Sequence, residues 1–302
     1  MMAALTGQLL IMALLMGGGL VLRKKKFLSR QGSSELGNIL VNIIIPCVIL
    51  KSYMVEFSVE RLNAWCLSIG LSLLSLLAAM GISWLAFGTR NGILNFASSF
   101  GNAGFIGIPL AQALFGEEAV FYIAAYVALL NLFQWTYGLY VMTGDREKVC
   151  PSAVLKNPVF ISIILGTVLF LLPIHYPDIV IRTLGYVADV NTPVAMVILG
   201  GYLAELKRKE MTVSRELFRC MILRLIVIPA VTLGLFYILP IKNSVMVFAL
   251  FIASATSVGG NIAVFASQQR TDYLLAVKTV CLSSVLSVIT MPVLFCVAQR
   301  LF

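Results

Sequence analysis

The sequence predicts an all-α polytopic membrane protein with ten transmembrane helices. Of its 302 residues, 60% are hydrophobic and only 12% are charged. Soluble domains contain about 25% charged residues. The apolar residues also gather in runs of about 20, which is the length that spans the hydrocarbon core of a bilayer as a helix. We therefore expect one integral membrane domain.

The predicted spans are residues 4–22, 37–55, 62–87, 92–115, 118–142, 154–173, 180–204, 216–239, 243–267 and 272–298. If the first loop, 23–30, is cytoplasmic, the inner loops contain 15 Lys and Arg residues and the outer loops contain five. This asymmetry follows the positive-inside rule and places both termini on the outer side. The net charge of +9 therefore reflects the loops and does not indicate nucleic-acid binding.

The first span is expected to be retained. No basic segment precedes it, and its basic cluster follows it, which is the reverse of a cleaved signal peptide. The sequence therefore predicts a multi-pass protein of the cell (inner or plasma) membrane.

The spans divide into two halves of five, residues 1–145 and 150–302. Because five is odd, a second copy would enter the membrane from the opposite side, which produces an inverted repeat. The second span contains Asn42 and Pro46, and the seventh contains Asn191 and Pro193. The fourth and ninth spans are both interrupted near their centres. These correspondences predict two inverted five-helix repeats whose broken fourth and ninth helices cross.

Small, polar and helix-breaking residues cause the two interruptions. They are Gly101, Asn102, Gly104, Gly107 and Pro109 in the fourth span, and Thr256, Ser257, Gly259, Gly260 and Asn261 in the ninth. Hydrocarbon offers no water to the backbone groups that such breaks release, so a break is tolerated where it is buried in protein or lines a cavity. The alternative is that the small residues let continuous helices pack closely.

The interruptions also predict a charge preference. A broken helix exposes up to four N–H groups at one new end and up to four C=O groups at the other. The N-terminal ends carry about +0.5 charge each and favour an anion such as a carboxylate, whereas the C-terminal ends favour a cation or a Lys side chain. A ligand that brings its own negative charge is expected.

Other polar residues lie within the spans. Asn131 and Gln134, on the fifth, either face the cavity or bond a neighbouring helix. Lys278, on the tenth, either neutralises the C-terminal helix ends or extends to the membrane surface. We expect the side chain of Arg224, on the eighth span, to extend to the membrane surface, because Arg215 and Arg219 precede it at helical spacing.

The fourth span resembles that of a known family. The run Gly101–Leu110, followed by Ala113–Gly116, is similar to the fourth helix of the auxin efflux carrier family. Leu22–Lys26 with Asn42–Leu50 resembles the family's first loop and second helix, and Asn191–Ala204 resembles its seventh helix. The resemblance covers essentially the whole chain.

This resemblance implies ten helices in two inverted repeats with a crossover of helices four and nine, and a homodimer. It also implies a carrier of small carboxylates, since bacterial relatives are described as carriers of malate or malonate and plant relatives export auxin. The chain departs from many relatives in lacking a proline near the ninth-span break. The family shares its architecture with bile acid/sodium symporters and sodium/proton antiporters.

We therefore expect a secondary transporter of a small organic anion that works by alternating access. A sodium- or proton-coupled symporter of the bile-acid type and a non-coupled channel or sensor are the alternatives. No enzyme is expected, because the spans contain no paired Asp, no Ser/His dyad and no H-E-x-x-H. The six Cys are scattered packing residues, so neither a metal nor a cofactor is expected.

The predicted substrate-binding residues are Asn42, Pro46, Gly101, Asn102, Gly104, Pro109, Asn131, Gln134, Asn191, Pro193, Thr256, Ser257, Gly259, Gly260, Asn261 and Lys278.

Overall fold

A computed structural model describes residues 2–147, 149, 151–172, 176–205 and 213–302. Within these ranges the chain is helical, and its β-type pairing is an isolated bridge between Gly101 and Val258. Several residues used above lie outside the described ranges. These are Cys150 and the inner-loop cations Lys148, Lys207, Arg208 and Lys209.

The helical segments in chain order are α1 (Met2–Lys24), α2 (Arg30–Ile39), η1 (Leu40–Ile44), α3 (Ile45–Tyr53), α4 (Val59–Phe87), α5 (Gly92–Ser99), η2 (Ala103–Gly107), α6 (Ile108–Phe115), α7 (Glu117–Phe133), η3 (Gln134–Gly138), α8 (Leu139–Thr143), α9 (Pro151–Leu155), α10 (Pro158–Leu171), α11 (Asp178–Asp189), α12 (Asn191–Glu205), α13 (Arg215–Ile222), η5 (Leu223–Val227), α14 (Ile228–Ile238), α15 (Ser244–Ala255), α16 (Asn261–Gln268) and α17 (Tyr273–Leu301).

Seven helical stretches among the described residues are long and apolar enough to cross a membrane: 3–24, 30–53, 59–87, 117–143, 178–205, 215–238 and 273–301. Three shorter apolar helices, Ala103–Phe115, Pro158–Leu171 and Ser244–Ala255, fall within the fourth, sixth and ninth predicted spans. Two of the three are short because a break divides their span. The structure therefore supports an all-helical membrane protein with seven clear spans.

Three of the π-helical turns, marked η, share a cause. Pro46, Pro109 and Pro229 each lie in the first turn of the α-helix that follows η1, η2 or η5. A proline ring clashes with the carbonyl one turn earlier and supplies no N–H. Widening the preceding turn from i→i+4 to i→i+5 bonding accommodates the ring without ending the helix. These prolines therefore reshape the helices that carry them.

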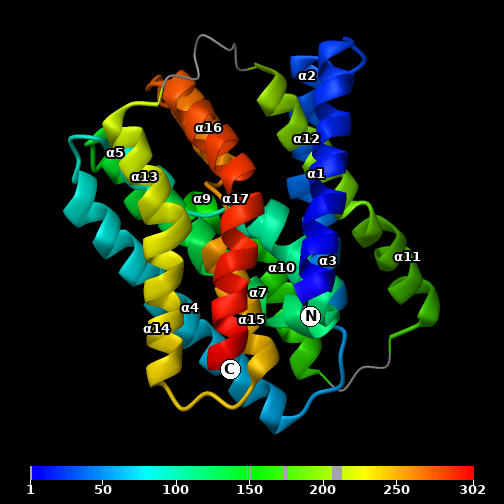
Figure 1. Cartoon of the computed structure of the whole chain (residues 1–302). Coiled ribbons are helices and arrows are strands. Elements are labelled where there is room, and N and C mark those ends of the chain that lie inside the picture. The colour runs from blue at the N-terminus through cyan, green and yellow to red at the C-terminus, as the bar shows by residue number, and fades with distance from the viewer. Residues whose placement is uncertain (1, 148, 150, 173–175, 206–212) are drawn as a thin grey trace.

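The helices form two groups that lie side by side in Figure 1. In one group α1 packs along α12, and α3 packs against α10 and α11. Gly200 allows α1 and α12 to approach closely, because a Cβ atom at this position would overlap the carbonyl of Met16. In the other group α4, α7, α14 and α15 pack together, with α5, α13 and α17 alongside.

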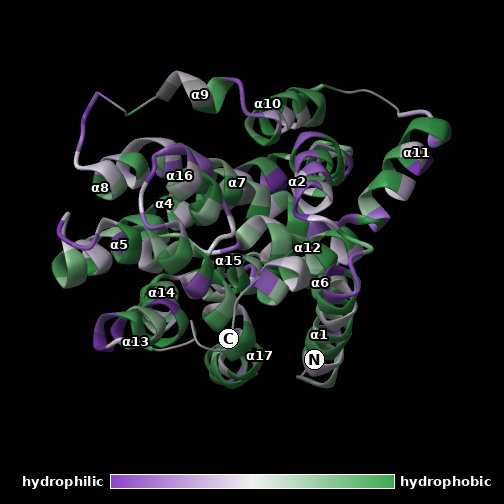
Figure 2. Ribbon diagram, turned by 90° about the horizontal axis from the view of Figure 1, so that it is seen from above, coloured by the Kyte–Doolittle hydropathy of each residue, from purple (hydrophilic) through white to green (hydrophobic). Residues whose placement is uncertain are grey.

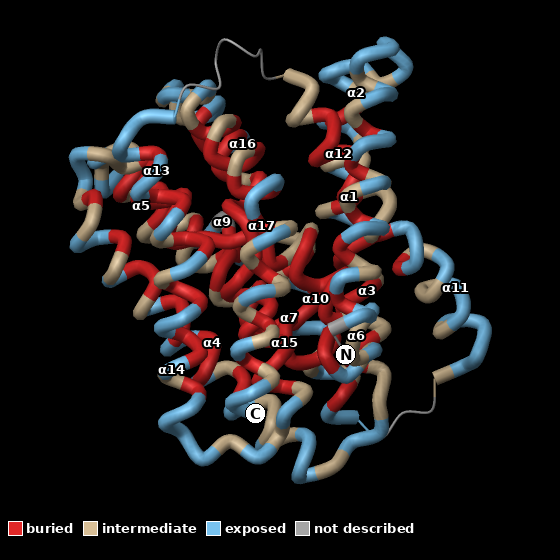
Figure 3. The backbone as a smooth tube through the Cα atoms, in the orientation of Figure 1, coloured by how far each residue is buried: buried red, intermediate tan, exposed pale blue. Residues whose placement is uncertain are grey.

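Burial and hydropathy follow the membrane pattern. The buried backbone gathers in the middle of the molecule, around α7 and α15 (Figure 3). Hydrophobic residues predominate on the peripheral helices α1, α14 and α17 (Figure 2). Large apolar side chains such as Leu14 and Ile289 are more than two-thirds exposed, at 77% and 68%. Such faces are stable when lipid rather than water surrounds them.

Candidate functional site

The two interruptions lie against each other. The backbone N–H of Asn102 donates to the carbonyl of Ser257 at 2.8 Å, and the N–H of Gly259 donates to the carbonyl of Phe100 at 3.1 Å. With the bridge between Gly101 and Val258, these bonds run antiparallel. The C-terminal ends of α5 and α15 and the N-terminal ends of η2 and α16 therefore meet in one place.

The buried guanidinium of Arg224 covers the carbonyl ends. Arg224 is fully buried, at 0% exposed. Its Nε donates to the carbonyl of Thr256 at 3.0 Å and its Nη2 donates to the carbonyl of Ser254. Its Nη1 lies 3.4 Å and 3.5 Å from the carbonyls of Ser98 and Ser99. One side chain thus binds the last carbonyls of both α5 and α15, where the helix dipoles are negative.

The expectation that Arg224 extends to the membrane surface is therefore wrong. Arg219 is exposed and lies over the ring of Phe87, whereas Arg224 points into the protein. Five residues separate the two, which in a helix of 3.6 residues per turn puts them on different faces. Hydrogen bonds to the carbonyls at two helix C-termini replace the hydrogen bonds to water that the guanidinium loses on burial.

Gly101 is required by this arrangement. A Cβ atom at Gly101 would overlap Arg224 Nη2 and the Thr256 hydroxyl. By contrast, a Cβ atom at Gly104 would meet the Ile45 side chain at an ordinary 3.7 Å. Only the first of these two predicted glycines allows a close approach.

The N-terminal ends of the broken helices are less completely bonded. Asn102 caps η2, because its Oδ1 accepts from the N–H of Phe105 at 3.2 Å, while its Nδ2 has no partner among the described residues. Asn261, at the start of α16, donates through Nδ2 to Gln134 Oε1 at 3.1 Å. Gln134 Nε2 in turn is buried without a described partner. Two amide donors are therefore available at this end.

A cavity of about 370 Å³ lies beside these N-terminal ends. We call it the inner chamber. Its described lining consists of neutral polar, aromatic and aliphatic residues without a charged side chain: Ser34, Gly37, Asn38, Val41, Asn42, Phe105, Asn131, Trp135, Asn157, Tyr202, Gly260, Asn261, Val264, Phe265 and Gln268. The structure thus brings four predicted residues, Asn42, Asn131, Gly260 and Asn261, to one cavity.

A second cavity of about 280 Å³ adjoins the inner chamber and shares Ser34, Tyr202, Val264 and Gln268 with it. Its other residues include Arg30, Glu205 and Tyr273, at the ends of α2, α12 and α17 that the positive-inside rule assigns to the cytoplasm. Glu205 forms an ion pair with Arg23 at 3.0 Å there. The chamber is therefore reached from the predicted inner side.

The remaining predicted residues lie outside the described lining of the inner chamber. Pro46 and Pro109 follow the π-helical turns η1 and η2. Thr256 and Ser257 bond within the break, the first to the carbonyl of Ala253 and the second to Ser284. Gly259 pairs with Phe100 in the break.

Asn191 and Pro193 begin α12. Asn191 is buried, and neither polar atom of its side chain has a described partner. It is placed neither in the break nor in the chamber lining.

Lys278 lies apart from the interruptions. It shares a helical stripe of α17 with Leu274, Val285 and Ile289, which are exposed at 44%, 52% and 68%. Of the two roles open to Lys278, the structure favours extension toward the surface, because Arg224 already occupies the carbonyl ends.

Sequence reasoning missed several chamber residues. Asn38 lies one turn before Asn42, whose Nδ2 donates to its carbonyl at 2.7 Å, so the i, i+4 spacing was an available signal. Asn157 precedes α10 and donates to Asn131 Oδ1 at 3.4 Å. Trp135 and Gln268 carry no local signal, because only the packing of distant helices brings them to the chamber.

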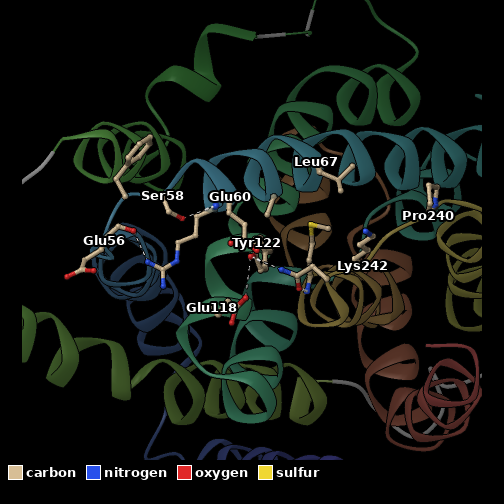
Figure 4. Close-up of a pocket in the computed structure, with 13 residues that line it drawn as sticks. Glu56, Ser58, Glu60, Leu67, Glu118, Tyr122, Pro240 and Lys242 are labelled. Carbon is tan, nitrogen blue, oxygen red and sulfur yellow. Dashed lines mark hydrogen bonds between the residues drawn. The ribbon is translucent and has the colours of Figure 1, made fainter.

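A larger pocket, of about 670 Å³, lies at the opposite end of α7 (Figure 4). In contrast to the chamber it is charged, with Glu56, Glu60, Glu118, Arg61 and Lys242 in its lining. The hydroxyl of Tyr122 accepts from Asn243 Nδ2 at 3.0 Å and donates to Glu118 at 3.3 Å. Glu118 and Asn131 are 13 residues apart on α7, which is about 20 Å along a helix. The two cavities are therefore separate.

Comparison with known proteins gives consistent results. A family model described as membrane transport protein matches residues 4–154 and 151–295. An uncharacterised transporter of Methanothermobacter thermautotrophicus is 23% identical over 292 residues, which covers 91% of this chain and 92% of that protein. An uncharacterised transporter of Methanocaldococcus jannaschii is 27% identical over 190 residues, which covers 57% of this chain and 60% of that protein.

Proposed function

Because the chain belongs to the membrane transport protein family, which includes the auxin efflux carriers that its motifs resemble, we propose that it carries a small organic anion across the cell membrane by alternating access. The family is one of transporters rather than enzymes. A multi-pass membrane protein with a transporter role is the premise of this proposal.

The observation that carries the proposal is the charge at the interruptions. Arg224 is buried and its described partners are carbonyl oxygens rather than a carboxylate. Its guanidinium therefore offsets the negative ends of two helices, and the N-terminal ends of η2 and α16 keep their positive character. Two buried amide donors, Asn102 Nδ2 and Gln134 Nε2, remain unbonded nearby. Helix N-termini and free amide donors both favour a negatively charged ligand.

In this proposal the chain crosses the membrane ten times, with the three short apolar helices completing the count. The antiparallel bonds between the interruptions support a crossover of inverted repeats. The inner chamber represents the inward-facing state, and the charged pocket at the other end of α7 lies on the outer route. Rocking of one helix group against the other would alternate the exposure of the break.

The first experiment is a thermal-stability screen of the purified protein. Monocarboxylates and dicarboxylates are added with and without sodium and at several pH values. A ligand that binds only the folded state increases the free energy of unfolding by mass action, by about 2.7 kcal/mol at 100 times its Kd, and so raises the apparent melting temperature. We expect a carboxylate to do so, and a screen in which only cations stabilise the protein would contradict the proposal.

A matched variant locates the site. Asn102→Asp keeps the oxygen that caps η2 but replaces the free Nδ2 donor by a negatively charged oxygen. We expect nearly normal stability together with loss of anion binding and of uptake into proteoliposomes. Normal uptake by this variant would remove Asn102 from the site. Saturable counterflow by the wild type distinguishes a carrier from a channel.

A further inference from the structure

An apolar groove of about 270 Å³ lies on the outside of the molecule, between α12, α13 and α17. Its residues are Leu203, Val213, Phe218, Met221, Cys281, Leu282, Val285 and Leu286. Met221 and Cys281 are buried at 4% and 3% exposed and form the floor, while Phe218 and Val285 are exposed at 59% and 52% and form the rim. It is separate from the inner chamber, whose lining shares none of these residues.

The groove has a positively charged end. Lys278 precedes Leu282 by one turn and Val285 by two turns on the same face of α17. Side chains on a helix tilt toward its N-terminus, so Lys278 extends away from the groove and toward the predicted cytoplasmic surface. Lys278 is half-buried and forms no ion pair or hydrogen bond with the described residues.

A second cation flanks the same end from the neighbouring helix. Arg215 precedes Phe218 by three residues on α13 and is exposed. The described acidic residues nearby have other partners or face elsewhere. Glu205 forms an ion pair with Arg23 at 3.0 Å, Glu216 lies two positions before Phe218 on the other side of α13, and Asp272 caps α17 through the N–H of Leu275 at 2.9 Å. A membrane-embedded apolar groove thus ends at two basic side chains near the level of the lipid headgroups.

We propose that this groove binds an anionic phospholipid, with one acyl chain between α13 and α17 and the phosphate at Lys278 and Arg215. The apolar lining matches a hydrocarbon chain, and the basic pair matches a negatively charged headgroup. The site joins the two helix groups, because α12 packs in one of them and α13 and α17 pack in the other. A bound lipid would therefore support the contact between the groups.

The test measures lipid binding directly and requires no transported substrate. Purified protein in detergent is mixed with phosphatidylglycerol or with phosphatidylcholine, and bound lipid is counted by native mass spectrometry alongside the melting temperature. We expect the wild type to retain phosphatidylglycerol in preference to phosphatidylcholine. Lys278→Ala should weaken phosphatidylglycerol binding about fivefold, as loss of one cation near an anionic headgroup predicts. Lys156→Ala, which removes an exposed cation distant from the groove, should not.

A second pair of variants tests the acyl-chain part. Val285→Trp fills the groove, whereas Ile289→Trp places the same indole ring one turn further along the same exposed stripe. We expect only Val285→Trp to reduce bound phosphatidylglycerol. Equal binding of the two lipids, a Lys278→Ala variant that binds like the wild type, or a change of oligomeric state without a change in bound lipid would overturn the proposal.

Discussion

The two sides of the interruption differ in how completely they are bonded. On one side, which we call the carbonyl side, Arg224 binds the last carbonyls of α5 and α15. On the other, the amide side, Asn102 and Gln134 each keep a buried N–H group without a described partner. A buried polar group with hydrogen-bond partners contributes to stability, whereas a buried donor without a partner lowers stability unless a ligand accepts its hydrogen bond. The carbonyl side is therefore expected to contribute to stability, whereas the amide side keeps two free donors that the proposed ligand could bind.

The largest expected effect is on the carbonyl side. Arg224→Met leaves two helix ends with buried, unbonded carbonyls, so we expect a loss of about 3–5 kcal/mol in unfolding free energy, the cost of removing one partner from a buried charged network. Thermal unfolding in detergent measures it. Arg224→Lys should recover only part, because an ammonium group cannot reach the same set of carbonyls. A Met variant that melts like the wild type would contradict this role.

A smaller effect is expected for Gly101→Ala. The new methyl group overlaps Arg224 and Thr256, so the network must shift, at a cost of about 1–3 kcal/mol for overpacking. Gly104→Ala is the matched control, since its methyl group meets only the Ile45 side chain at 3.7 Å. Melting temperatures of the two variants should therefore separate. If they fall together, helix flexibility rather than space explains both glycines.

The smallest effect on stability, and the sharpest on function, is expected on the amide side. Asn261→Ala removes the bond to Gln134, which is worth about 1 kcal/mol. Uptake of the anion that the stability screen identifies should nevertheless fall strongly, because Asn261 lies both at the start of α16 and in the chamber lining. Unchanged uptake, with stability also unchanged, would show that the amide side does not bind the substrate.

The sequence predicted the positions of the two interruptions because their cause is local. Glycines and Asn102 within an apolar run disfavour a continuous helix wherever the chain folds, whereas Pro109 lies beyond the break and only widens the turn η2. Of the residues that the sequence singled out, Asn42, Asn131 and Asn261 line the inner chamber, and their role in binding stays a prediction. The position predicted for Arg224 was wrong. It was inferred from the helical spacing to Arg219, whereas the carbonyls that bind Arg224 belong to α5 and α15, which are distant in sequence.

Composition and periodicity by themselves determined the all-helical membrane class, and local residue chemistry determined where two helices break. Both depend on short-range physics, namely the length needed to cross hydrocarbon and the backbone donors that glycine and proline disturb. Only the tertiary structure decided which cation serves the broken ends, since Arg224 is buried among carbonyls while Lys278 lies on an exposed stripe. It also decided which polar residues share a chamber, because helices far apart in the chain must pack before their side chains can meet.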